Sequence, residues 1–238
     1  MSQERPLLRT LVVLLTFTAV AGGCTAPAGP QPTPSPSPPA AAVEATGELS
    51  HPYLLNERLG RGVNLGNALE APEEGSWGVV LKAEYFQLIK DAGFHAVRIP
   101  IRWSAHAAQS PPYTIAPAFF ARIDWAVEQA LSRGLLVVIN VHHYDELARS
   151  PAAHRERFLA LWQQIAERYK DQPDELLFEI LNEPHDALTA PLWNELLKDA
   201  LAIIRRANPD RVVVVGVTNR GGVGGLSGLE LPAEDQNL

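Results

Sequence analysis

Short apolar segments alternate with amphipathic helical segments along the chain, and this alternation constrains the fold more than any other feature. The expected strands are residues 62–66, 96–101, 135–141, 176–181 and 211–216. The expected helices between them are residues 83–92, 117–133, 152–170 and a helix that Thr189 caps and Pro209 ends. Because apolar strands that alternate with helices form a parallel sheet covered by those helices, the pattern predicts an α/β fold.

Polar side chains at the ends of these strands distinguish two architectures, an open doubly wound sheet and a (β/α)8 TIM barrel. These side chains belong to Asn67, Arg98, His142, His143, Asn182 and Glu183. A barrel gathers the carboxyl ends of all its strands into one mouth. An open sheet instead carries a glycine-rich phosphate turn after its first strand, and residues 67–70 form no such turn. The sequence therefore favours a (β/α)8 barrel, and we expect it to be truncated after about five βα units, since such a domain usually takes about 250 residues.

The first 50 residues differ from the rest of the chain. Residues 1–23 contain a short basic region, an apolar core and small residues, which is typical of a secretory signal peptide. The small residues before Cys24, the single cysteine, resemble a bacterial lipobox, in which that cysteine is lipidated; ordinary signal cleavage is the alternative. Residues 24–50 are proline-rich and indicate an extended linker. We expect a membrane-anchored lipoprotein at the cell surface or in the periplasm, with a catalytic barrel domain over residues 51–238.

Composition and charge indicate which kinds of molecule this chain is a poor candidate to bind. The chain has 27 acidic and 20 basic residues and a net charge of −7, without a basic stripe, which makes nucleic acid a poor partner. His142 and His143 lack a third ligand at a sensible spacing, so we expect no metal. We also expect no cofactor, and a monomer.

Glu183 is the strongest candidate for chemistry. A carboxyl group that is desolvated at the mouth of an apolar barrel favours its protonated form, so Glu183 could donate a proton near neutral pH. Pro184 restricts the backbone of the residue before it, which would hold the acid in place.

Four segments together resemble glycoside hydrolase family 5, the cellulase group, whose fold is a (β/α)8 barrel. The segment Asn182-Glu183-Pro184 is similar to the family's acid/base motif on the fourth strand. Residues 62–70, 97–100 and 138–144 are similar to its first, second and third strands. The resemblance implies a retaining hydrolase of β-1,4-glucan, and of mannan in some members, with a polysaccharide as its substrate.

The resemblance also implies roles at the centre of the site. Glu183 would be the general acid/base, and Asn182 would bind the 2-hydroxyl of the reacting sugar. Arg98 would orient the nucleophilic carboxylate and keep it ionised. A salt bridge inside the barrel is the alternative for Arg98.

Further residues would contact sugar around that centre. His142 and His143 would line the sugar site, or serve a structural role at the strand end. Asn67 and Glu70 would contact sugars further from the cleaved bond, with plain surface polarity as the alternative for Glu70.

One part of the family pattern has no counterpart among the five strands. The family's nucleophilic glutamate stands at the end of a seventh strand, and none of Glu179, Glu195 and Glu230 fills that position. We therefore expect the nucleophile to lie outside these 238 residues, and we expect little hydrolysis by this chain alone. An inactive carbohydrate-binding surface lipoprotein and an unrelated parallel α/β enzyme are the other interpretations.

Lipidation at Cys24 is directly testable. When the chain is expressed in a bacterium that processes lipoproteins, we expect the mature protein to begin at a diacylated Cys24, because small residues precede it and a linker follows. Mass spectrometry of the N-terminal peptide measures this. A mature chain that begins at another residue, without lipid, would show that the prediction is wrong.

Overall fold

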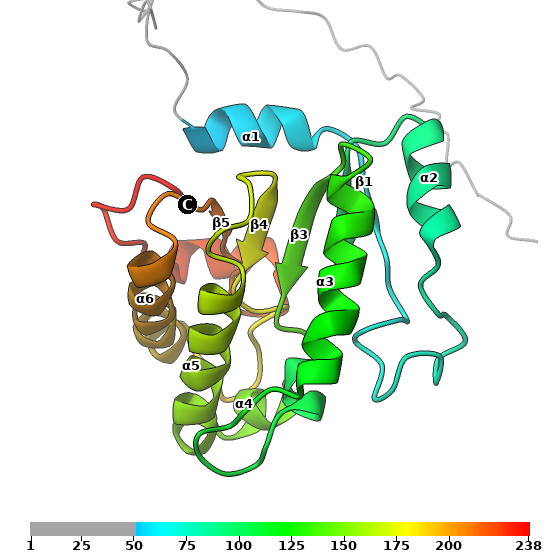
Figure 1. Ribbon diagram of the computed structural model, residues 1–238. Helices are drawn as coiled ribbons and strands as arrows, with labels where there is room; N and C mark the ends of the chain where they lie inside the picture. Colours follow the sequence, from blue (N-terminus) through cyan, green and yellow to red (C-terminus); the bar gives the residue numbers. More distant parts are fainter. Residues whose placement is uncertain (1–50) are drawn as a thin grey trace, which may run out of the picture. The chain divides into compact units, whose positions relative to one another are not determined.

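The computed structural model describes residues 51–238, so the expected signal peptide, Cys24 and the linker lie outside the described residues. Five strands form one sheet: β1 (Gly62–Asn64), β2 (Ala96–Ile99), β3 (Leu136–Asn140), β4 (Leu176–Glu179) and β5 (Val213–Val214). They lie in the order β1-β2-β3-β4-β5, and every neighbouring pair is parallel. Sequential order without reversal is that of a barrel wall, so the fold is a partial (β/α) barrel, as predicted (Figure 1).

The helices that connect the strands match the predicted ones closely. They are α2 (Ala83–Asp91), α3 (Pro117–Leu131), α5 (Pro151–Arg168) and α6 (Ala190–Ala207). Thr189 occupies the N-cap of α6 as predicted, but its side chain makes no capping hydrogen bond. Pro191 instead stands in the first turn of α6, where the absence of an N–H costs nothing. Among the described residues, no helix is long and apolar enough to cross a membrane.

Four shorter elements were not predicted. They are the helices α1 (His51–Leu59) and α4 (Asp145–Arg149) and the 3₁₀ helices η1 (Trp103–His106) and η2 (Val223–Gly228). All five strands are also shorter than predicted. β2, for example, ends at Ile99 because Pro100 has no N–H to continue the ladder.

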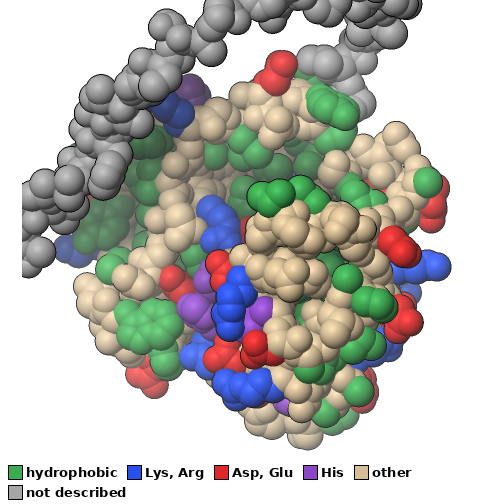
Figure 2. Space-filling model, turned by 180° about the vertical axis from the view of Figure 1, so that it is seen from behind, with side chains coloured by type: hydrophobic (Ala, Val, Ile, Leu, Met, Phe, Trp, Pro, Cys, Tyr) green, Lys and Arg blue, Asp and Glu red, His purple; other side chains and the backbone are tan. Residues whose placement is uncertain are grey.

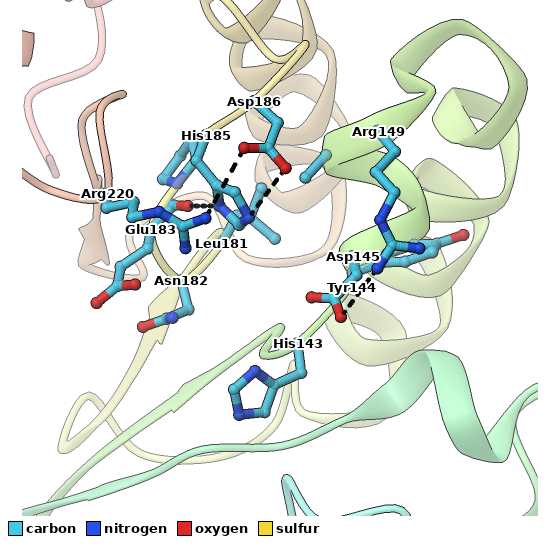
Figure 3. Close-up of a pocket in the computed structure, with 12 residues that line it drawn as sticks. His143, Tyr144, Asp145, Arg149, Leu181, Asn182, Glu183, His185, Asp186 and Arg220 are labelled. Atoms are coloured by element: carbon cyan, nitrogen blue, oxygen red, sulfur yellow. Dashed lines mark hydrogen bonds and ion pairs between the residues drawn. The ribbon is translucent and has the colours of Figure 1, made fainter.

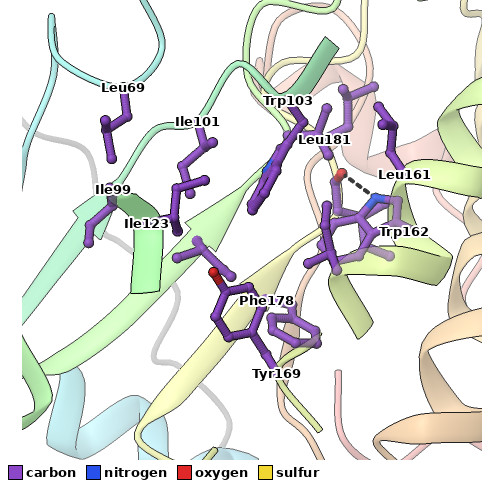
Figure 4. Close-up of a cluster of buried hydrophobic side chains, with 14 of the residues drawn as sticks. Leu69, Ile99, Ile101, Trp103, Ile123, Leu161, Trp162, Tyr169, Phe178 and Leu181 are labelled. Atoms are coloured by element: carbon purple, nitrogen blue, oxygen red, sulfur yellow. Dashed lines mark hydrogen bonds between the residues drawn. The ribbon is translucent and has the colours of Figure 1, made fainter. Parts of the chain in front are cut away.

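The outer face of the sheet packs against the helices. The strand residues of this face are Val97, Ile99, Val137, Ile139, Leu176, Phe178 and Val213, and all belong to the main hydrophobic core. Trp162 of α5 packs on Phe178 with ring centroids 5.6 Å apart (Figure 4). Its indole N–H donates to the carbonyl of Ile180 over 3.1 Å, so the buried ring has no unpaired polar atom.

The inner face of the sheet has an apolar end and a polar end. Its apolar residues, Ala96, Leu136, Val138, Leu177 and Val212, form a second cluster with Leu55 of α1. Helix α1 lies across the amino ends of the strands (Figure 1). The polar residues Asn64, Arg98, Asn140 and Glu179 lie nearer the carboxyl ends, where Asn64 pairs with Arg98 in register and Asn140 pairs with Glu179. The sheet therefore directs its polar side chains to the end opposite α1.

A buried guanidinium ties β5 to the segment before β4. Arg211 is 5 % exposed, and it donates to the carbonyls of Leu176, Gln172 and Tyr169 over 2.9, 2.7 and 3.2 Å. It also donates to the carbonyl of Pro173. Burial lowers the pKa of Arg211, which shows that desolvation of its charge is costly.

Removing this guanidinium should destabilise the fold. Arg211→Met leaves several buried carbonyls without a donor, so we expect it to lower the free energy of unfolding by about 3 kcal/mol. Arg206→Met is the matched control, because Arg206 is bonded to an exposed Gln163 side chain and should change stability by less than about 0.5 kcal/mol. Urea denaturation measures both. Equal effects would contradict the structural role of Arg211.

Candidate active site

The predicted site residues gather at the carboxyl ends of the strands. Arg98 lies on β2, His142 and His143 directly follow β3, and Asn182 and Glu183 follow β4. Figure 2 shows histidine, basic and acidic side chains close together in the middle of one face of the molecule. The fold thus brings together residues that lie more than 80 positions apart in the sequence.

Arg98 is the centre of a hydrogen-bond network. Its Nε and Nη2 donate to the two carboxylate oxygens of Glu179 over 2.6 and 2.7 Å. Its Nη1 donates to Oδ1 of Asn64 over 2.8 Å, and its Nη2 also donates to Oδ1 of Asn182 over 2.9 Å. The guanidinium therefore links β1, β2, β4 and the loop after β4. The salt bridge inside the barrel, which the sequence left as an alternative for Arg98, is present.

The charges around Arg98 outweigh the cost of burying it. Burial by itself would lower the pKa of the Arg98 guanidinium. The hydrogen bonds and charge of Glu179, together with the charges of Glu183 and Glu70, raise that pKa above its usual value instead. Arg98 therefore remains a full positive charge at the centre of the site.

Asn182 and Glu183 extend in the same direction beside a cavity of about 300 Å³ (Figure 3). Oδ1 of Asn182 accepts from Arg98, so its amide N–H groups are left to bind another acceptor. Glu183 is exposed, which differs from the enclosed carboxyl group that the sequence argument expected. It stands in the loop that follows β4, beside a cavity open to solvent, and not within the apolar interior.

Several loop residues of the site have a left-handed backbone. Asn67, His143 and Glu183 have φ values of 64°, 48° and 46°. Asp186 and Arg220, which line the same cavity, have φ values of 53° and 56°. Such conformations cost roughly 1–3 kcal/mol for residues other than glycine and persist only where the surroundings enforce them. The backbone itself thus helps to fix Glu183, in addition to the restraint expected from Pro184.

The two histidines pack edge to face, with ring centroids 4.4 Å apart. Burial, together with the charges of His143 and Arg98, lowers the pKa of His142 to about 3. His142 is therefore neutral at any pH near neutrality. Within residues 51–238, no three His, Cys, Asp or Glu side chains are arranged to hold a metal ion.

The loop after β1 carries Asn67 and Glu70 into the site region. Glu70 is 4 % exposed, so plain surface polarity does not describe it. Its carboxylate accepts the backbone N–H of Asn67 and, over 3.0 Å, that of Ala68. Glu70 therefore holds the exposed Asn67 in position, and direct contact between Glu70 and sugar stays a prediction.

Three residues of the site region were not singled out as site residues by the sequence argument. Glu179 was considered only as a nucleophile, although a charged residue inside an apolar strand is itself a signal of a buried partner. Asn140 is fully buried and bonded to Glu179 over 3.3 Å. Trp77 is 43 % exposed in the loop after β1, and its ring lies edge to face with His143 at 5.5 Å. Nothing in its local sequence marks Trp77.

Comparisons with known proteins agree with this geometry. Residues 61–238 match the model of the family described as cellulase (glycosyl hydrolase family 5). Endoglucanase H of Acetivibrio thermocellus is 44 % identical over 165 residues, which are 69 % of this chain and 18 % of that protein. Endoglucanase Cel5A from the hyperthermophilic Thermotoga maritima is 56 % identical, with a TM-score of 0.77 over 78 % of this chain and 60 % of that one.

A second structure of Thermotoga maritima Cel5A, in complex with mannotriose, is 55 % identical with the same TM-score of 0.77 and the same coverage of 78 % and 60 %. The chain thus spans less than two thirds of the length of these relatives. The family match nevertheless covers most of the chain, and the parallel order of its strands is that of a barrel wall. The chain belongs to glycosyl hydrolase family 5, the cellulase family.

Proposed function

We propose that the chain carries the acid/base side of the active site of a retaining glycoside hydrolase that cleaves β-1,4-glucan. The observation that carries the proposal is the Arg98 network, which holds Asn182 beside Glu183 at the carboxyl ends of the strands. The names of the similar endoglucanases support β-1,4-glucan as the substrate class. The mannotriose complex of a similar protein makes mannan the second candidate.

The mechanism requires two carboxyl groups about 5–5.5 Å apart. Glu183 protonates the glycosidic oxygen while a second carboxylate attacks the anomeric carbon, which breaks the glycosidic bond and forms a glycosyl-enzyme. Glu183 then takes a proton from water, whose oxygen displaces the second carboxylate. The family resemblance assigns that nucleophile to the end of a seventh strand.

The other side chains would position the sugar. With its Oδ1 held by Arg98, Asn182 would donate an N–H to the 2-hydroxyl of the reacting sugar. Asn67 and the two histidines would bind neighbouring hydroxyls. Trp77 would stack on a sugar ring, because the indole is 43 % exposed and its edge-to-face contact with His143 holds it in place. Secretion and anchoring through a lipid on Cys24 complete the proposal, since polymeric glucan lies outside the cell.

Glu183→Gln tests the acid/base role, in a form of the protein that carries both carboxyl groups. We expect hydrolysis of cello-oligosaccharides to fall about 10²–10⁴-fold, because glutamine cannot supply the proton. An aryl cellobioside should lose much less in its first step, because its leaving group needs less protonation. Steady-state and burst kinetics with both substrates measure this. Glu195→Gln, an exposed change on α6, is the control. Equal losses for both substrates would exclude Glu183 as the acid.

Trp77→Ala tests the binding surface without catalysis. We expect the affinity of the chain for cellotetraose to fall about tenfold, which is about 1.4 kcal/mol. Isothermal titration calorimetry measures the dissociation constant. Tyr53→Ala removes an aromatic ring that is 65 % exposed on α1, at the other end of the sheet, and serves as the control. An unchanged affinity for the Trp77 variant would rule out stacking on this ring.

A further inference from the structure

Asn140 has no part in the mechanism proposed above, yet its side chain contacts Ile101, His142 and Glu179. It is the last residue of β3, its side chain is fully buried, and it pairs in register with Glu179 of β4. A buried amide must satisfy both its donors and its acceptor. The partners that satisfy Asn140 show what it does.

Two of these partners fix which way the amide points. The backbone N–H of Ile101 is buried and donates to Oδ1 of Asn140 over 3.3 Å. Oε1 of Glu179 is an acceptor, and Nδ2 of Asn140 donates to it over 3.3 Å. Turning the amide over would place two donors together at Ile101 and two acceptors together at Glu179. The NH₂ group of Asn140 is therefore on the side of Glu179.

The second hydrogen of that NH₂ group meets His142. Nδ2 of Asn140 lies 3.1 Å from Nδ1 of the His142 ring. Because the amide nitrogen is a donor, Nδ1 must be the acceptor and carry no proton. A neutral imidazole has one N–H, which then lies on Nε2. We propose that Asn140 is a positioning residue that fixes His142 as the neutral Nε2–H tautomer and so keeps a hydrogen-bond donor on the ring nitrogen that Asn140 does not contact.

The surrounding charges support this assignment. His143 contacts the His142 ring from the same loop, and Arg98 of β2 faces it as a permanent positive charge. Glu179 of β4 is engaged by Arg98 and Asn140, while Glu183 and Glu70 act on Arg98. Burial, His143 and Arg98 all act in one direction, and they lower the pKa of His142 to about 3. Protonation at Nδ1 is thus opposed both by the amide and by the local charge.

For function, the inference rests on the proposed glycan site and adds one feature to it. A His142 that kept its Nε2–H across the whole working range of pH would donate to a sugar hydroxyl without changing charge. Its hydrogen bond to substrate would then not be lost as the pH rises through the ordinary range of histidine titration. Asn140 would act through His142, without touching the sugar.

Nitrogen NMR tests the tautomer directly and needs no activity. The full chain is labelled with ¹⁵N-histidine, and the His142 signals are identified by their absence in His142→Gln. In the wild-type chain we expect an unprotonated Nδ1 and a protonated Nε2 at every pH from 8 down to about 5, well below the ordinary histidine pKa near 6.5. A proton on Nδ1, or titration near pH 6.5, would overturn the proposal whatever the enzyme assays show.

Two variants test whether Asn140 is the cause. In Asn140→Asp, a carboxylate replaces the donor beside Nδ1, so we expect His142 to be mostly protonated at pH 6. In Asn140→Ala the donor is lost without a new charge, and the Nδ1–H tautomer should become populated. The matched control is Asn208→Asp, because Asn208 is 3 % exposed and its side-chain amide is bonded to the carbonyl of Ala166 on α5 instead of to a histidine.

The outcomes separate a positioning role from a merely structural one. A shift of the His142 tautomer in both Asn140 variants, with none in Asn208→Asp, supports the proposal. A wild-type tautomer that persists in Asn140→Ala overturns it. If Asn140→Asp does not fold, the alanine variant and the wild-type spectrum still decide. Failure of the glycan assays with the expected NMR result would reject the proposed function and leave the role of Asn140 intact.

Discussion

The ion pair between Arg98 and Glu179 is the constraint on which the site depends. Two charged side chains, 27 % and 12 % exposed, lie on the inner face of a sheet whose other residues there are mostly apolar. Desolvating such charges costs several kcal/mol per ion unless geometry and further hydrogen bonds compensate. The two parallel N–H···O bonds, with Asn64, Asn140 and Asn182 around them, supply that compensation. The cost of burial thus accounts for the three asparagine partners on neighbouring strands and loops.

The same ion pair also orients the side chains that form the site. Arg98 donates to Oδ1 of Asn182, and Glu179 accepts from Nδ2 of Asn140. The two charges therefore orient two amides, one at the end of β3 and one in the loop after β4. Asn182 is left with free N–H groups, and Asn140 is left with an N–H that donates to Nδ1 of His142. Charge therefore sets the orientation of neutral groups that would bind an uncharged substrate. The apolar half of the inner face, closed by Leu55 of α1, keeps this polar layer at the opposite end.

The fold could be predicted from the sequence because its periodicity is strong. The short apolar segments predict all five strands, and the helical spacing of apolar residues predicts the four helices that connect them. Pro100 accounts for the early end of β2. The short elements α1 and α4 could not be predicted, since they carry few periodic residues and form through tertiary contacts, such as that of Leu55 with the strands. The side chain of Thr189 makes no capping hydrogen bond, and Pro191 removes one of the first-turn N–H groups that such a bond could satisfy.

The sequence predicted most residues of the candidate site, but not the hydrogen bonds and ring contacts that join them. Residues that follow strands, such as Asn182, are visible in the sequence because parallel strands end at one edge. The exposure of Glu183 and the burial of Glu70 could not be foreseen, since both depend on the path of loops with left-handed backbone. The link from Arg98 to Glu179 joins positions 81 residues apart, and only the register of β2, β3 and β4 brings them together. Trp77 reaches His143 through a loop, so no sequence spacing predicts their contact.

The most direct test of this account is a crystal structure of the chain with cellobiose. We expect one sugar ring at the carboxyl ends of β2, β3 and β4, with its 2-hydroxyl within hydrogen-bond distance of Nδ2 of Asn182. Oδ1 of Asn182 should remain on Arg98, and the glycosidic oxygen should face Glu183. A disaccharide bound elsewhere, or bound here with Asn182 released from Arg98, would contradict the claim that the Arg98–Glu179 pair orients the substrate-binding amide.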